Sequence, residues 1–119
     1  MKKFLLISVC LAGLGLYSFG NNNPEPTGST EQVVVDNDEL RVVEFTSEPG
    51  KDVCGKGMHT HDPHLTIVLT DGAVRVTTKD GQSEEYQLNS GTAIWFDADT
   101  HKAINSGKGE MKVMLVYLK

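Results

Sequence analysis

The sequence is poor in cysteine, in aromatic residues and in basic charge. It holds two cysteines in 119 residues, only 7% of its residues are aromatic, and 16 acidic residues stand against 11 basic ones. The acidic balance argues against nucleic acid or an anionic membrane surface as a partner. The length suffices for one compact domain and not for two.

The N-terminus has the pattern of an export signal. A basic start is followed by an apolar run at residues 4–16, too short to span a bilayer comfortably, and small residues at Ser18 and Gly20 fit a cleavage site. We therefore expect a signal peptide at residues 1–20 and an exported protein, periplasmic or secreted, with no membrane attachment after cleavage. A lipid anchor on Cys10 is the alternative, which Val9 disfavours because a small residue is expected there.

The rest of the chain reads as a linker followed by a β domain. Residues 21–31 contain no apolar side chain and predict a flexible linker, which leaves residues 32–119 as the folded domain. Asp71-Gly72 and Asp80-Gly81 predict hairpin turns within a β-meander, and no later stretch keeps a helical period. Short segments rich in β-branched residues predict strands at 32–35, 40–46, 65–69, 73–78, 84–88, 93–96 and 112–118. Many short, closely spaced strands indicate a sandwich or a small barrel.

Histidines supply the main chemical signal. In a strand, alternate side chains share a face, so His59 and His61 project together and form a pair of imidazole nitrogens. His101 follows a short strand and a turn, where a barrel could bring it against this pair. Three imidazoles on one face could hold a divalent transition metal. The alternative is that the pair is solvent-exposed decoration and that His101 belongs to a turn.

These residues resemble the two motifs of the cupin superfamily. The first motif, G-x5-H-x-H-x3–4-E-x6-G, is matched by His59, His61 and Gly72, and the second, G-x5-P-x-G-x2-H-x3-N, by Gly91, His101 and Asn105 with one residue missing before the histidine. The resemblance covers residues 40–118. It implies an all-β fold, a single cupin-type jelly-roll β-barrel, with a metal held by His59, His61 and His101.

The departures from the motifs bear on the ligand set. Leu65 stands where the family has its acidic ligand, and its neighbours are His64 and Thr66, so no carboxylate is available there. A three-histidine site remains, as in cupin-like oxygenases that lack the carboxylate. His64 could be a fourth ligand if the strand is irregular at Pro63; in a regular strand it would face the other way.

Cys54 lies five residues before His59 and is the only cysteine left after the predicted cleavage, so no internal disulfide can form. An unpaired thiol is notable in an exported protein because that compartment is oxidising. It can be a small buried hydrophobic residue, the site of an intermolecular bridge, a metal ligand, or a residue just outside the metal site.

The sequence leaves three functions open. The first is a metal-dependent enzyme, an oxygenase or isomerase of a small organic molecule; the second is a metal- or ligand-binding sensor or carrier without turnover; the third is an interaction module without metal. Iron, manganese, nickel, copper and zinc all accept imidazole, and a homodimer is compatible with the apolar last strand. A mostly apolar pocket is expected from the candidate inward-facing residues, which are Ile67, Leu69, Val74, Val76, Ile94, Phe96, Met114 and Val116.

Overall fold

The computed structural model describes residues 28–119; the predicted signal peptide and residues 21–27 of the predicted linker lie outside this part. The described residues form nine strands and no helix. The strands are β1 (Ser29–Asp36), β2 (Leu40–Ser47), β3 (His59–His61), β4 (His64–Val68), β5 (Gly72–Thr78), β6 (Ser83–Leu88), β7 (Ala93–Phe96), β8 (Asp99–Asn105) and β9 (Met111–Leu118). Within this range no helix has the length and hydropathy that crossing a membrane requires.

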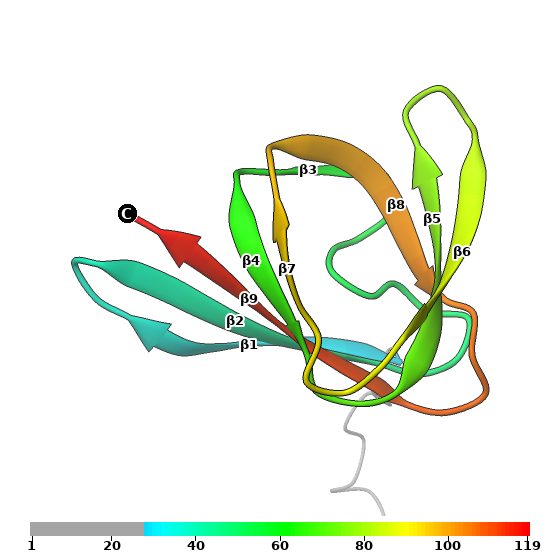
Figure 1. The fold of residues 1–119 in the computed structure, drawn as a ribbon, viewed down its shortest axis with the longest axis horizontal. Coiled ribbons are helices and arrows are strands. Elements are labelled where there is room, and N and C mark those ends of the chain that lie inside the picture. The colour runs from blue at the N-terminus through cyan, green and yellow to red at the C-terminus, as the bar shows by residue number, and fades with distance from the viewer. Residues whose placement is uncertain (1–27) are drawn as a thin grey trace, which may run out of the picture.

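The strands form two sheets that enclose the interior between them (Figure 1). One sheet has the order β1-β2-β9-β4-β7 and the other the order β3-β8-β5-β6. The all-β jelly-roll prediction is confirmed, but the expected closed barrel is wrong, because across residues 28–119 no strand of one sheet pairs through its main chain with a strand of the other. Alternation of side chains records which face of a strand is buried and does not record which edges pair, so the sequence could not show that the sheets stay open.

One of the two predicted hairpins is confirmed. Strands β5 and β6 pair in antiparallel register from Gly72↔Leu88 to Thr77↔Ser83, and Gly81 in their turn has a φ of 90° that favours glycine. The Asp71-Gly72 turn is not a hairpin, because β4 pairs with β7 and β9 while β5 pairs with β6 and β8. That turn carries the chain from one sheet to the other.

The first strand begins at Ser29, inside the segment expected to be a linker. Strand β1 lies at the edge of its sheet and pairs only with β2, its register shifting between Val33 and Val35. Its three valines, Val33, Val34 and Val35, are all more than 40% exposed. An edge strand held by main-chain hydrogen bonds needs no buried face, which explains why its polar first residues did not reveal it.

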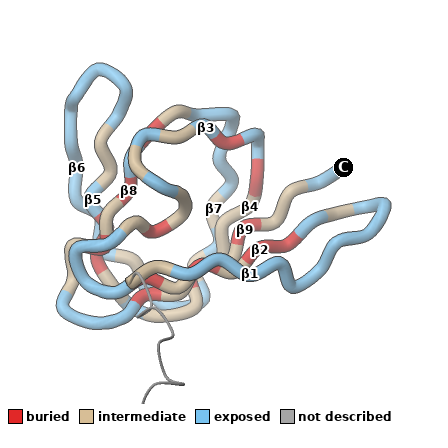
Figure 2. Tube along the Cα trace, turned by 180° about the vertical axis from the view of Figure 1, so that it is seen from behind, coloured by how far each residue is buried: buried red, intermediate tan, exposed pale blue. Residues whose placement is uncertain are grey.

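The core lies where the two sheets face each other (Figure 2). Its buried apolar residues come from both sheets and include Val43, Phe45, Val68, Val74, Ala103, Met111, Val113 and Leu115. On β4 and β9 the predicted inward residues were one position out of phase: Val68, Val113 and Leu115 are buried, whereas Ile67, Met114 and Val116 are only partly buried. Strand β9 is apolar on both faces, so its sequence pattern does not show which face points into the core.

Asn105, the last residue of the second motif, joins three segments of the fold. The residue is 1% exposed. Nδ2 donates hydrogen bonds to the carbonyl oxygens of Ser47 and Gly109, both at 2.9 Å, and Oδ1 accepts one from the Gly107 N–H at 3.0 Å. The residue therefore ties the end of β8 to the end of β2 and to the loop before β9.

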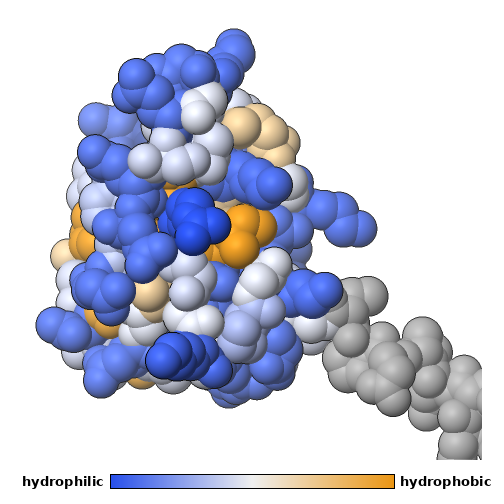
Figure 3. Space-filling model, turned by 90° about the vertical axis from the view of Figure 1, so that its right-hand side faces the viewer, coloured by the Kyte–Doolittle hydropathy of each residue, from blue (hydrophilic) through white to orange (hydrophobic). Residues whose placement is uncertain are grey.

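Seen from the β5–β6 side, the surface is predominantly hydrophilic (Figure 3).

Candidate metal centre

Strand register brings the three predicted histidines together. Strand β3 pairs with β8 so that His59 lies opposite His101 and Thr60 opposite Thr100. Since side chains alternate, the two threonines occupy the other face, where their hydroxyls are 2.8 Å apart. His101 thus belongs to a strand and not to a turn.

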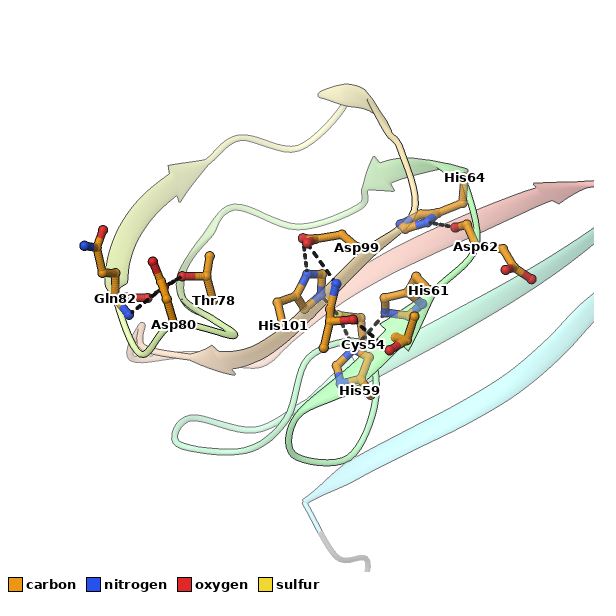
Figure 4. Close-up of polar contacts among 12 residues, drawn as sticks. Cys54, His59, His61, Asp62, His64, Thr78, Asp80, Gln82, Asp99 and His101 are labelled. Carbon is orange, nitrogen blue, oxygen red and sulfur yellow. Dashed lines mark hydrogen bonds and ion pairs between the residues drawn. The ribbon is translucent and has the colours of Figure 1, made fainter.

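The donor atoms of four side chains converge. His59 Nε2 lies 2.8 Å from His61 Nε2, and Cys54 Sγ lies 3.5 Å from the Nε2 atoms of both His59 and His101. One ligand atom from each of these four residues falls within 4.8 Å of all the others. Figure 4 shows the three rings gathered around Cys54, with His64 set to one side beside Asp62.

Hydrogen bonds at the outer ring nitrogens orient two of the histidines. His59 Nδ1 donates to the Gly57 carbonyl at 2.8 Å, and His101 Nδ1 donates to Asp99 Oδ2 at 2.9 Å. A carbonyl or carboxylate oxygen can only accept, so in the neutral rings the proton is on Nδ1 and the lone pair of Nε2 faces the cluster. Partners of this kind fix the tautomer and orientation of metal-binding histidines.

His61 is held from the other sheet. Its Nδ1 lies 2.8 Å from the hydroxyl of Tyr117 on β9, which can either donate or accept. In the metal-free chain Nε2–H of His61 can donate to His59 while Tyr117 donates to Nδ1; with a metal, His61 can present its Nε2 lone pair and donate from Nδ1 to Tyr117. Burial lowers the pKa of His61 to about 4, helped by the neighbouring histidines, so the ring is neutral at neutral pH as a ligand must be.

Cys54 is placed beside the histidines by the loop that precedes β3. The Val53 N–H donates to the Ala103 carbonyl of β8 at 3.0 Å, and Asp52 forms a bridge with Ile104. Burial raises the pKa of the Cys54 thiol to about 12, with a further contribution from Asp52. The metal-free thiol is therefore protonated, and a bound cation would have to displace that proton. In the sequence, only its spacing from His59 pointed to Cys54.

Gly55 permits the close approach of this loop to His59. Its φ of +152° favours glycine, and a Cβ at this position would lie 2.9 Å from His59 Cδ2. A larger residue would have to displace the imidazole or the loop that carries Cys54.

The donor set fits a divalent transition metal. A separation of 2.8 Å between two nitrogens matches two ligands about 2.0–2.1 Å from one ion at roughly a right angle. A separation of 3.5 Å between sulfur and nitrogen matches a sulfur at about 2.3 Å and a nearly tetrahedral angle. Imidazole and thiolate are ligands that zinc, copper and iron accept.

His64 lies next to this cluster. Residues Asp62 and Pro63 carry the chain from β3 in one sheet to β4 in the other, so His64 faces the interior despite its odd offset from His61. The His64 and His61 ring centroids are 4.9 Å apart, and His64 Nδ1 donates to the Asp62 carbonyl at 2.8 Å. The four-residue cluster includes Cys54 and does not include His64. Coordination of a metal by His64 stays a prediction.

The family follows from a match that spans most of the chain. The sequence model of the cupin domain matches residues 43–117. The chain belongs to the cupin family. No curated protein matches this chain.

Solved structures share the fold at low sequence identity. A cupin domain from Bordetella pertussis has a TM-score of 0.69 at 24% identity, over 82% of this chain and 99% of that one. A polyketide cyclase from Streptomyces resistomycificus has a TM-score of 0.60 at 21% identity, over 82% of this chain and 69% of that one. A sugar phosphate isomerase of the cupin superfamily from Silicibacter pomeroyi has a TM-score of 0.56 at 17% identity, over 77% of this chain and 60% of that one.

This cupin departs from the family motif at the acidic ligand. Leu65 alternates with the buried His64 and so lies on the other face of β4. Thr66 lines the interior cavity instead, and its hydroxyl cannot supply an anionic ligand. Within residues 28–119, the fourth donor atom of the cluster comes from the Cys54 thiol.

A cavity of about 370 Å³ lies between the two sheets and reaches the cluster. Cys54, His64, Asp99 and His101 are among its lining residues. Most of the remaining wall is apolar and includes Val68, Val74, Ile94, Phe96, Val113 and Leu115. The predicted apolar pocket is thus present, with four of its predicted residues, Val74, Val76, Ile94 and Phe96, in its wall.

Proposed function

We propose that this cupin is a metal-dependent enzyme, an oxygenase or isomerase that acts on a small organic molecule. The observation that carries the proposal is the convergence of His59, His61, His101 and Cys54 next to an apolar cavity. Three histidines and Cys54 would hold the metal, which would be iron, manganese, nickel, copper or zinc. The fold neighbours described as a cyclase and an isomerase support an enzyme over a sensor or carrier without turnover.

A bound metal would supply positive charge that polarises or binds an oxygen atom of the substrate. The protein's own part is to keep the donors in place and to exclude water. Gly57, Asp99 and Tyr117 orient the three imidazoles through their outer nitrogens. The apolar walls of the cavity bury the body of the substrate, which strengthens polar contacts at the cluster because the local dielectric is low.

We also propose that the protein is exported and acts in the periplasm or outside the cell. The support is the basic start, apolar run and small residues of positions 1–20. In an oxidising compartment, coordination and burial would protect the single remaining thiol at Cys54 from forming intermolecular bridges.

The experiment is elemental analysis of the purified chain, before and after reconstitution with each of the five metals. The comparison protein carries His59→Ala, His61→Ala and His101→Ala together, with its fold checked by circular dichroism. Thr60→Ala is the matched control, because Thr60 lies between two of the histidines but on the opposite face of β3. We expect about one metal per chain in the parent and in Thr60→Ala, and its loss from the folded triple variant.

Four outcomes separate the candidate functions. A redox-active metal together with oxygen consumption supports an oxygenase, and turnover without oxygen supports an isomerase. Tightly held zinc without turnover would contradict the enzyme and leave a sensor or carrier. Little metal in the reconstituted parent would contradict the metal site and leave an interaction module. Cys54→Ser tests the fourth donor: a lower metal affinity with unchanged stability supports coordination by sulfur.

A further inference from the structure

The interior cavity is small and its wall is mostly apolar. Its volume of about 370 Å³ corresponds to about twelve non-hydrogen atoms at about 30 Å³ each, the volume a water molecule occupies in the liquid. Its wall draws apolar residues from both sheets, among them Val74 and Val76 of β5 and Val113 and Leu115 of β9. A ligand here would bury most of its surface against hydrocarbon, so its body has to be largely apolar.

The charges around the cavity disfavour an anionic ligand. Within residues 28–119, the wall of the cavity includes no lysine or arginine. Asp99 is the one carboxylate in this wall, and its oxygens accept hydrogen bonds from His101 Nδ1 at 2.9 Å and from the Thr100 N–H at 2.8 Å. An anionic group that lies away from the cluster would be buried without a countercharge and near a negative group, which is costly; only a metal bound at the cluster could offset its charge.

His64 offers one directed polar contact. His64 is 3% exposed, and its ring stacks on that of Phe96 with the ring centroids 5.6 Å apart. Because Nδ1 donates to the Asp62 carbonyl, Nε2 of the neutral ring carries a lone pair and can only accept. Among residues 28–119 no hydrogen bond engages this Nε2, whereas the Nε2 atoms of His59, His61 and His101 all have partners in the cluster.

We infer that the cavity binds a largely apolar molecule with an uncharged body, whose hydroxyl or N–H group donates a hydrogen bond to His64 Nε2. The inference rests on the proposed function in that this cavity would be the substrate site. His64 then selects and orients the ligand, and the metal is held by the other three histidines and Cys54.

The test uses three probes that share a propylphenyl body of about the right size: 4-propylphenol, which donates a hydrogen bond, 4-propylanisole, which does not, and the anion 4-propylbenzoate. Binding to the full chain is measured by titration calorimetry, with and without metal. In the metal-free protein we expect the phenol to bind about tenfold more tightly than the anisole, the value of one neutral hydrogen bond, and the benzoate to bind most weakly. Equal affinities in the metal-free protein, or a preference for the benzoate there, would overturn the inference.

Variants assign the effect to His64. His64→Leu should remove the preference for the phenol, whereas His64→Gln, which keeps an acceptor, should retain part of it. Tyr86→Phe is the matched control, because Tyr86 also lines the cavity but its hydroxyl donates to Glu84. Val76→Phe should fill the cavity and abolish binding of all three probes. A preference that survives in folded His64→Leu, or that disappears in Tyr86→Phe, would contradict the assignment, as would unchanged binding to Val76→Phe.

The metal content of His64→Leu separates the two proposals. We expect it to equal that of the parent, because His64 lies outside the four-residue cluster. Loss of the metal in the folded variant would make His64 a ligand and overturn this inference while supporting a metal function. Selective binding of the phenol by a protein that takes up no metal would uphold the cavity's selectivity and contradict the proposed enzyme.

Discussion

Acidification should destabilise the metal-free protein through His61. Burial lowers the pKa of this residue to about 4 in the folded state, against its ordinary value of 6.5. Between these values the unfolded chain binds the proton and the folded chain does not. The stability that neutral His61 contributes is therefore fully present above pH 6.5 and is lost as the pH falls toward 4. From pH 7.5 to pH 4.5 the loss attributable to this group is about 2–3 kcal/mol, at about 1.4 kcal/mol for each unit of pKa shift.

Urea unfolding of the chelator-treated protein at several pH values between 7.5 and 4.5 measures this loss. His61→Gln is the comparison, because glutamine does not titrate and its amide can still bond to Tyr117. Other titrating groups act in both proteins, so the difference between the two pH profiles isolates His61. His64, whose pKa burial also lowers, should leave a smaller loss of the same sign in the variant. If His61→Gln loses as much stability as the parent over this range, the reasoning is wrong.

Three single substitutions should weaken either the fold or the metal affinity. Asn105→Ala removes three hydrogen bonds and should lower the free energy of unfolding by about 3 kcal/mol at about 1 kcal/mol each, measured from urea midpoints; a loss below 1 kcal/mol would contradict the joining role. Tyr117→Phe should weaken metal affinity about tenfold in competition with a chelator, and unchanged affinity would show that His61 needs no such partner. Gly55→Ala should weaken metal binding and lower stability by about 1–3 kcal/mol, whereas Gly109→Ala, with open space around it, should do neither; equal effects would refute a local cause.

The strands were predictable because their residue types and turn signals are local. Seven predicted segments coincide with strands, and the hairpin at Asp80-Gly81 was found from the dipeptide alone. Strand β8 was missed, because its sequence, DTHKAIN, has few β-branched residues and is held as a strand by pairing with β3 and β5. Strand β1 was recognised only from residue 32 onward for a similar reason.

Arrangement in space was less predictable. The phases of β4 and β9 could not be read because both faces of these strands carry apolar residues. The three histidines of the cluster were predictable from alternation and from the family motifs. The place of Cys54 was not, because it depends on the hydrogen bond between Val53 and Ala103, residues far apart in the sequence. His64 faces inward only because the chain changes sheets at Asp62 and Pro63, a change that periodicity within one strand cannot show.

The donor atoms of the cluster and the facing wall of the cavity come from different sheets. The four donors of the cluster come from β3, β8 and the loop bound to β8, whereas Thr66, Ile94 and Val113 on the other sheet form the facing wall of the cavity. Substitutions on that wall can reshape the cavity without moving a donor atom. Diverging descendants, or a protein engineer, could therefore exchange one ligand for another while keeping the same cluster of donor atoms.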